Sequence, residues 1–207
     1  FGVGDLVVSN NDKFLAYSLD IKGSEYYTIF VREIKSNKIV TKEINETSGN
    51  IIFSLDDKYI FYSKLDHNHR ARKIFRHEIG NSSKADDLIF EEKSEAFTVG
   101  IGISSDEKYY FISSSDHNTS EQFYFNIEEK NPKPKLIQKR EKGILYSVSS
   151  WNGYFYMHTN KNAEDFKIDK TDNTNFNDWK TFVPAKDETL IGGLTFLKNW
   201  IIRSEVS

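Results

Sequence analysis

The sequence predicts an all-β protein built as a β-propeller, and three observations lead to that fold class. The composition is rich in aromatic residues, with 16 Phe, 11 Tyr and 3 Trp against only 3 Pro, which favours strands. A short turn motif recurs at nearly constant spacing along the chain. The strand after that turn has no polar face, unlike a strand with one side in water. Sequence repeats of about 40 to 50 residues with four strands each are typical of propeller blades.

The repeat is clearest in "SLDDKYIFY", which starts at Ser54. Copies in the same register are "SNNDKFLAY", "SSDEKYYFI", "SSWNGYFYM" and a weaker "TFLKNWIIR", which start at Ser9, Ser104, Ser149 and Thr195. The successive spacings are 45, 50, 45 and 46 residues. A blade lies between two neighbours, so its middle strands are covered on both faces. We therefore expect four aromatic side chains to be mostly buried: Tyr59, Phe61, Tyr109 and Phe111.

Each repeat contains four predicted strands. The first precedes the turn, the second follows it, and the third ends at Ile34, Ile79 or Ile127 in "FVREI", "FRHEI" and "FYFNI". The fourth is a segment such as "DLIFEE" or "PKLIQ". The predicted blades are residues 1–48, 49–94, 95–141 and 142–187, with an incomplete fifth at 188–207. The alternative is an antiparallel sandwich with similar hairpins, which the five in-register copies disfavour.

Composition also limits the classes of partner. The chain has 28 basic and 31 acidic residues, a net charge of −3, which gives no electrostatic footprint for nucleic acid or an anionic membrane. It has no cysteine, which excludes disulfides and a cysteine nucleophile and fits a cytoplasmic location. No apolar run approaches the ~18 residues of a membrane span. The first residue is Phe1 and no signal peptide is recognisable, so we expect the chain to begin inside a longer protein.

Several stretches resemble the propeller of oligopeptidase B (protease II) enzymes in the prolyl oligopeptidase family. These are "FLAYSLD" (14–20), "LDHNHRARKIFRHEIG" (65–80), "DDLIFEEKSEAF" (86–97), "TSEQ" (119–122) and "PAKDETLIGGLTFLKNW" (184–200). The combination of "RHEIG" with "LIFEE" is the most specific of them. The resemblance implies a seven-bladed propeller that caps an α/β-hydrolase domain and admits only short peptides. It also implies a serine peptidase that cleaves after Arg or Lys, with short basic peptides as substrates.

The catalytic machinery of such an enzyme is not predicted in these 207 residues. No Gly-x-Ser-x-Gly nucleophile elbow is present, and the alternating βα pattern of a hydrolase domain is missing. We therefore predict no catalytic, cofactor-binding or metal-binding residues, no cofactor, and no peptidase activity from this chain alone. Its expected partner is the catalytic domain. His67 with His69, and the polar loop 169–178, are weak metal candidates that we interpret as solvated loops.

The best candidates for a binding role lie in "DHNHRAR" (66–72), in the connection between a second and a third strand. Asp66, His69 and Arg70 are predicted to lie on a propeller rim that faces peptide, together with the connections 19–25, 114–120 and 159–164. Loops on a rigid scaffold commonly carry function, although these loops could simply be solvated. We also expect self-association through exposed blade faces.

Two other functions remain open on the sequence alone. The first is a freestanding propeller module that binds a protein or peptide without catalysis. The second is a different propeller enzyme, such as a glycosidase, which would need two carboxylates placed across a cleft.

Overall fold

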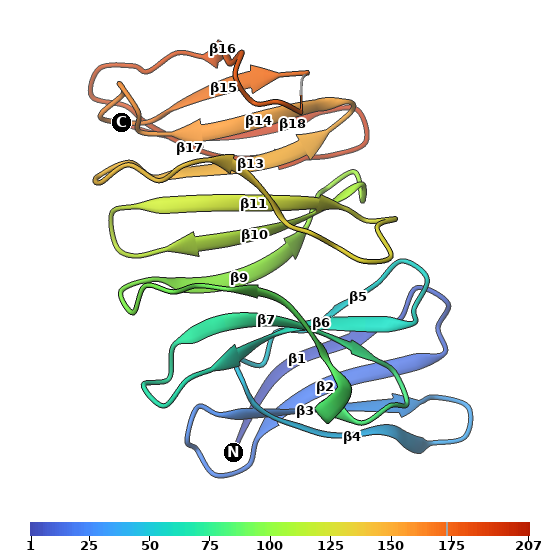
Figure 1. Cartoon of the computed structure of the whole chain (residues 1–207). Helices are drawn as coiled ribbons and strands as arrows, with labels where there is room; N and C mark the ends of the chain where they lie inside the picture. The colour runs from blue at the N-terminus through green and yellow to red at the C-terminus, as the bar shows by residue number, and fades with distance from the viewer. Residues whose placement is uncertain (173) are drawn as a thin grey trace. The chain divides into compact units, whose positions relative to one another are not determined.

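The computed structural model describes residues 1–172 and 174–207, and it is all-β apart from one short 3₁₀ turn, η1 (Ser83–Ala85). The chain divides into two compact units, Phe1–Ile101 and Gly102–Ser207. Figure 1 shows the strands in chain order from blue to red. The described strands thus agree with the all-β class that the sequence predicts.

The first unit contains two successive antiparallel meanders in one sheet with the strand order β1-β2-β3-β4-β6-β7-β8. Its strands are β1 (Gly2–Val8), β2 (Phe14–Asp20), β3 (Tyr27–Glu33), β4 (Lys38–Thr47), β5 (Ile52–Phe53), β6 (Tyr59–Leu65), β7 (Ala71–Glu78) and β8 (Asp87–Glu91). The short β5 pairs only with β6. A single residue pair, Thr47 with Lys64, links β4 to β6, so the sheet narrows between the two meanders.

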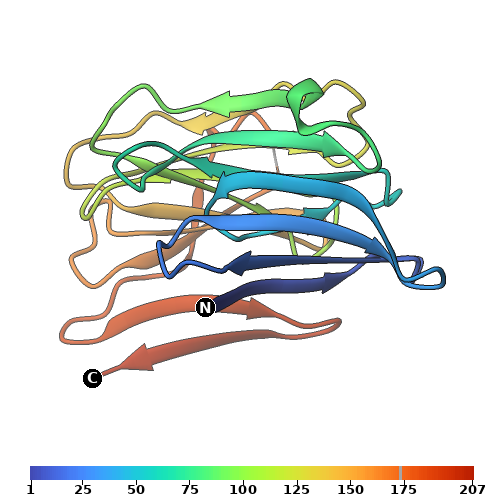
Figure 2. The same cartoon turned by 90° about the horizontal axis from the view of Figure 1, so that it is seen from below.

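The second unit contains two four-stranded antiparallel sheets and a final hairpin. The strands are β9 (Thr98–Ile103), which begins in the first unit, β10 (Tyr109–Ser115), β11 (Ser120–Asn126), β12 (Lys135–Gln138), β13 (Tyr146–Trp151), β14 (Tyr154–Thr159), β15 (Lys167–Thr171), β16 (Lys180–Val183), β17 (Leu190–Phe196) and β18 (Ile201–Val206). The sheet orders are β12-β11-β10-β9 and β13-β14-β15-β16. Figure 2 shows the hairpin of β17 and β18, in red, which carries the C-terminus.

The strands after the second and third repeated turns, β6 and β10, are buried on both faces. In β6, the exposed fractions of Ile60, Phe61 and Tyr62 are 0%, 3% and 3%. In β10, Phe111 is 7% exposed and its neighbours Tyr110 and Ile112 are also buried. The expected burial of Phe61 and Phe111 is therefore confirmed. Tyr59 and Tyr109 keep partial exposure because each is the first residue after its turn, at the end of its strand.

The repeated turn is closed by hydrogen bonds from its first residue. The Ser54 hydroxyl donates to the Asp56 carboxylate (2.7 Å) and accepts from the backbone N–H of Tyr59 (3.0 Å). Asp57 takes a left-handed φ of 55°, which Asp and Asn tolerate better than most residues. Its carboxylate accepts hydrogen bonds from the backbone N–H groups of Asn10 and Asn11 in the preceding turn, at 2.9 and 2.8 Å. The motif therefore forms a turn and also joins the two meanders of the first unit.

Candidate functional site

The sequence predicts a rim loop over residues 66–72; in the structure the β6–β7 connection is residues 66–70, since β7 begins at Ala71, and this loop is organised around Asp66. The Asp66 carboxylate accepts hydrogen bonds from the backbone N–H groups of Asn68 (2.8 Å) and Arg70 (3.1 Å). The Asp66 N–H donates to the Arg70 carbonyl, and the His69 N–H donates to the Asp66 carbonyl. His69 takes a left-handed φ of 57°. These contacts close the loop into a compact turn and leave the side chains of His69 and Arg70 exposed.

The pKa of the Asp66 carboxyl is lowered from its ordinary value. Burial alone would raise this pKa, but the backbone N–H donors of Arg70 and Asn68 outweigh that effect, with help from the positive charges of His67 and Arg72. The Arg72 guanidinium lies 3.9 Å from the Asp66 carboxylate. Asp66 is therefore an ionised group whose hydrogen-bonding capacity is used to shape the loop.

The loop contacts two other connections of the first unit. The Tyr26 hydroxyl donates to the Asp66 carbonyl at 2.9 Å, and the ring centroids of Tyr26 and His69 are 4.0 Å apart. The Arg70 guanidinium donates to the carbonyl of Ala96 at 3.5 Å. The structure thus brings the loop 66–70 together with the β2–β3 and β8–β9 connections, on one surface of this unit.

An Asp or Asn at the end of each second strand is a repeated signal that the sequence analysis did not use. The Asp20 carboxylate accepts from the backbone N–H groups of Gly23 (2.9 Å) and Glu25 (2.7 Å). In the second unit, the Asp116 carboxylate accepts from the N–H of Thr119 at 2.8 Å, and Asn160 Oδ1 accepts from the N–H of Leu145 at 2.8 Å. With Asp66, these positions are spaced by 46, 50 and 44 residues. That spacing alone could have revealed the rim turns.

The "TSEQ" stretch joins β11 to the segment that enters β13. Each of its four side chains accepts a backbone N–H from residues 140–148: Thr119 from Gly143 (3.1 Å), Ser120 from Tyr146 (2.6 Å), Glu121 from Arg140 (3.0 Å) and Gln122 from Val148 (2.5 Å). The Ser120 hydroxyl also donates to the Tyr146 carbonyl at 2.7 Å. These residues therefore hold two neighbouring sheets of the second unit together.

Comparison with known proteins assigns the chain to a family. A family model described as "Prolyl oligopeptidase, N-terminal beta-propeller domain" matches residues 1–207. The chain belongs to this family. The predicted propeller fold and the predicted family resemblance are therefore confirmed. The limits of the individual blades remain a prediction.

Individual relatives agree with this assignment. Protease 2 of Moraxella lacunata is 28% identical over 156 residues, which cover 74% of this chain and 23% of that protein. Dipeptidyl aminopeptidase BI of Pseudoxanthomonas mexicana is 26% identical over 209 residues, which cover 99% of this chain and 29% of that protein. The chain spans less than a third of the length of either relative.

Solved structures show the same fold. Oligopeptidase B from Trypanosoma brucei, in a closed form with covalently bound antipain, matches with a TM-score of 0.91 and 25% identity over 99% of this chain and 29% of that chain. Oligopeptidase B from Leishmania major matches with a TM-score of 0.93 and 21% identity over 99% of this chain and 29% of that chain. Both alignments extend over nearly all of this propeller chain.

The "RHEIG" motif forms a buried network within this propeller. His77 is fully buried, with Nδ1 2.6 Å from the Asp86 carboxylate and Nε2 3.0 Å from the Thr41 hydroxyl. The Tyr62 hydroxyl donates to the second oxygen of Asp86 at 2.8 Å. Arg76, the first residue of the motif, pairs with Asp87 at 2.7 Å. The pairing of this motif with "DDLIFEE" is thus a direct side-chain contact between β7 and the segment that enters β8.

Thr41, His77 and Asp86 have the connectivity of a hydroxyl–imidazole–carboxylate triad, but their burial excludes chemistry. The His77 ring bridges the Asp86 carboxylate and the Thr41 hydroxyl, and this hydroxyl also accepts from the N–H of Gly80 at 3.1 Å. Thr41 is 1% exposed and His77 is 0% exposed, so no substrate can reach the hydroxyl. The network satisfies buried polar groups and stabilises the fold.

In residues 1–172 and 174–207, no three His, Asp or Glu side chains are close enough to share a metal ion. The polar loop 169–178 includes Asn173, which lies outside the described residues. No helix in the described part of this propeller is long and apolar enough to cross a membrane.

Proposed function

We propose that this chain is a fragment of the substrate-gating propeller of an oligopeptidase B-like serine peptidase that cleaves short peptides after Arg or Lys. The family match over residues 1–207 supports the proposal, since it places the whole chain in a peptidase propeller. The shares of the relatives that the chain covers, 23% and 29%, leave most of each relative for other domains. In this proposal the catalytic α/β-hydrolase domain is the partner of the propeller and supplies the serine nucleophile.

The rim surface around the loop 66–70 is the part of the first unit that we propose to face incoming peptide. Its backbone is fixed by Asp66 and by the Tyr26 contact, so the side chains of His69 and Arg70 project from a preorganised turn. A rim loop that is already ordered restricts the entry of peptides by its shape, and it loses little conformational entropy when a peptide binds. We assign Asp66 the role of positioning the loop, and His69 and Arg70 the role of lining the entrance.

The experiment is a comparison of two proteins on the same substrates. We expect the longer native protein to hydrolyse a fluorogenic peptide with Arg or Lys before the scissile bond, and the 207-residue chain to give no turnover. A matched peptide with Pro at that position tests the other specificity within the family. Turnover by the 207-residue chain that a serine-directed inhibitor abolishes would refute the proposal, as would a preference of the longer protein for Pro.

Gating is tested separately with substrate size. The same Arg-containing sequence is offered as a short peptide and within an unfolded protein chain. We expect cleavage of the short peptide only, because the propeller restricts entry. Equal cleavage of both substrates would show that the propeller does not gate the active site.

A freestanding interaction module is the second candidate, and exposed apolar side chains at β1 and β18 favour it. Leu6 is 67% exposed and Val206 is 65% exposed, which is unusual for a surface without a partner. The intact mass of the native protein separates the two candidates. A native mass near 24.1 kDa favours the module, and a mass about three to four times larger, as the covered shares of the relatives imply, favours the peptidase. A cytoplasmic location is part of the proposal and rests on the absence of cysteine.

A further inference from the structure

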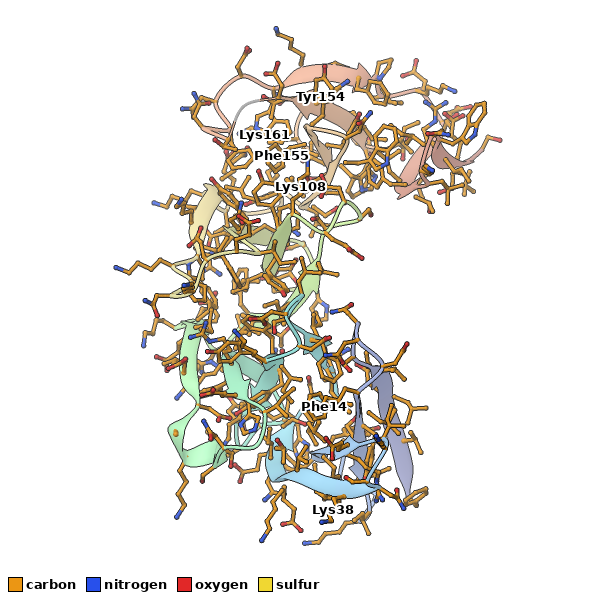
Figure 3. The ribbon with its side chains drawn as sticks, turned by 90° about the vertical axis from the view of Figure 1, so that its right-hand side faces the viewer. Phe14, Lys38, Lys108, Tyr154, Phe155 and Lys161 are labelled. Atoms are coloured by element: carbon orange, nitrogen blue, oxygen red, sulfur yellow. The ribbon has the colours of Figure 1, made fainter. Side chains whose placement is uncertain are left out.

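A pocket of about 220 Å³ lies on one face of the sheet formed by β14, β15 and β16. Its lining residues are Tyr154, Lys170, Thr171, Asp172, Asp178, Lys180, Thr181 and Phe182. Figure 3 labels Tyr154 beside Phe155 on β14. Successive residues of a strand point to opposite faces, so Tyr154 is on the pocket face and 38% exposed, whereas Phe155 is on the other face and 3% exposed.

The pocket holds a half-buried lysine among aromatic rings. The Lys170 ammonium is 3.5 Å from the ring centroid of Tyr154, 5.5 Å from that of Tyr156 and 5.6 Å from that of Phe182. These cation–π contacts stabilise the charge only in part. Lys180 is directly opposite Lys170 in the pairing of β15 with β16, and like charges in that position repel.

Lys170 lacks a carboxylate partner in the described part of the chain. Lys180 has one, because its ammonium lies 3.7 Å from the Asp178 carboxylate. The carboxylate of Asp172 lines the same pocket but forms no described ion pair with Lys170. Taking a cation partly out of water without a contacting counter-ion is costly, so a carboxylate in contact with the Lys170 ammonium would stabilise it.

Equivalent positions in the other sheets are either covered or neutralised. Each is a third-strand residue that lies diagonally across from the first aromatic residue after the repeated turn: Val31, Arg76, Tyr124 and Lys170. In the first unit, Val31 is 0% exposed in a core shared with β5 and β6, and Arg76 pairs with Asp87 at 2.7 Å. In the second unit, Tyr124 packs against Phe176 from the β15–β16 connection, with ring centroids 5.1 Å apart.

The cover over the pocket face stops short of Lys170. The hairpin of β17 and β18 packs on the part of this face near Tyr156 of β14, where the rings of Tyr156 and Phe196 are 5.3 Å apart and Ile191 is fully buried. Phe182, on β16, is 44% exposed. Phe176 belongs to the connection between the third and fourth strands of one sheet and packs on Tyr124 of the preceding sheet. By analogy, the segment expected over Lys170 is the connection between the third and fourth strands of the blade that β17 and β18 begin.

We propose that the Lys170 pocket is a socket for this connection of the following blade, and that an Asp or Glu on it pairs with the Lys170 ammonium. The proposal rests on the proposed function, in which the propeller continues beyond these residues. An anion placed between Lys170 and Lys180 relieves the repulsion between the two ammonium groups, which favours a carboxylate. The aromatic rings around Lys170 suit a carboxylate on an apolar stem, as in Asp or Glu.

The test is zero-length crosslinking of the longer native protein with a carbodiimide, followed by peptide mapping. This reagent joins an ammonium to a carboxylate only when the two are in contact. We expect Lys170 to be linked to an Asp or Glu that follows residue 207 in sequence. Lys186 with Glu205, whose atoms are 2.7 Å apart, is the internal positive control.

A second measurement uses acetylation rates in the wild-type protein. We expect Lys170 to react about tenfold more slowly in the longer protein than in the 207-residue chain, because a paired and covered ammonium reacts only through local opening. The exposed Lys133 is the matched control and should react equally in both.

Links from Lys170 only to Asp172 or Asp178, or no link while the control pair is joined, would overturn the socket. Equal acetylation of Lys170 in both proteins would overturn it as well. Failure of the proposed function looks different: a longer protein without peptidase activity that still forms the expected link keeps the socket and refutes the peptidase.

Discussion

Replacing Ser120 with Ala should weaken the contact between the two sheets of the second unit that "TSEQ" holds together. The Ser120 hydroxyl accepts from the Tyr146 N–H and donates to the Tyr146 carbonyl, at 2.6 and 2.7 Å, and both residues are buried. The substitution leaves two buried backbone groups without their partner. At about 1–3 kcal/mol for each of the two unsatisfied groups, the free energy of unfolding should fall by about 2–6 kcal/mol.

The assay for this variant is urea unfolding combined with hydrogen exchange. We expect a lower midpoint and faster exchange at the N–H groups of Tyr146 and Val148, which Ser120 and Gln122 accept in the wild type. Ser105→Ala is the matched control, since Ser105 is exposed in a turn, and should change stability by less than about 0.5 kcal/mol. A loss for Ser120→Ala no larger than for this control would refute the claim that the motif joins the sheets.

Four further outcomes are expected. Phe61→Ala should lower the free energy of unfolding by about 3–5 kcal/mol in urea melts, since it removes a buried aromatic side chain and leaves a cavity. Asp20→Asn should flatten the acid limb of a stability–pH profile. Burial raises the pKa of Asp20, but the backbone N–H donors lower it by more, so the folded pKa is below the ordinary value. The stabilisation by Asp20 is therefore present above its unfolded pKa of about 4 and is lost as pH falls through the folded pKa. Burial raises the pKa of Tyr146 to about 12, so its stabilisation is complete below pH ~10 and lost as pH rises through the folded pKa. Burial also raises the pKa of four other tyrosines, Tyr62, Tyr109, Tyr124 and Tyr156, so absorbance at 295 nm should show several tyrosines that ionise late, and Tyr146→Phe should reduce their number by one. Light scattering on the 207-residue chain should give a mass above 24.1 kDa, because apolar side chains such as Leu6 and Ile202, 67% and 52% exposed, favour association; a stable monomer contradicts this expectation.

The fold could be predicted from the sequence because its strongest signals are local and repeated. The Ser turn needs a hydroxyl, a carboxylate or amide and a residue that tolerates positive φ, all within five positions of Ser54. The two-faced burial of β6 follows from its lack of polar residues. Such signals depend on short-range geometry, so five copies in register identify the architecture without any knowledge of tertiary contacts.

The candidate site could be predicted only in part because its geometry depends on distant residues. The loop 66–70 was located from its position between strands. Its contact with Tyr26 joins residues 40 positions apart, and no local pattern encodes it. The role of Asp66 in shaping the loop depends on which N–H groups point at its carboxylate, which a sequence does not show. Lys170 is not predicted for the same reason, since its aromatic surroundings come from two other strands, β14 and β16.

Two of the motifs that carry the family resemblance lie at contacts between neighbouring segments of the propeller. "RHEIG" with "DDLIFEE" is a buried contact between β7 and the segment entering β8, and "TSEQ" connects neighbouring sheets of the second unit. These contacts stabilise the propeller fold and carry no information on a substrate. Family membership and the proposed substrate preference are therefore separate conclusions. The family model that matches residues 1–207 establishes the first, and kinetics of the longer protein on Arg, Lys and Pro substrates test the second.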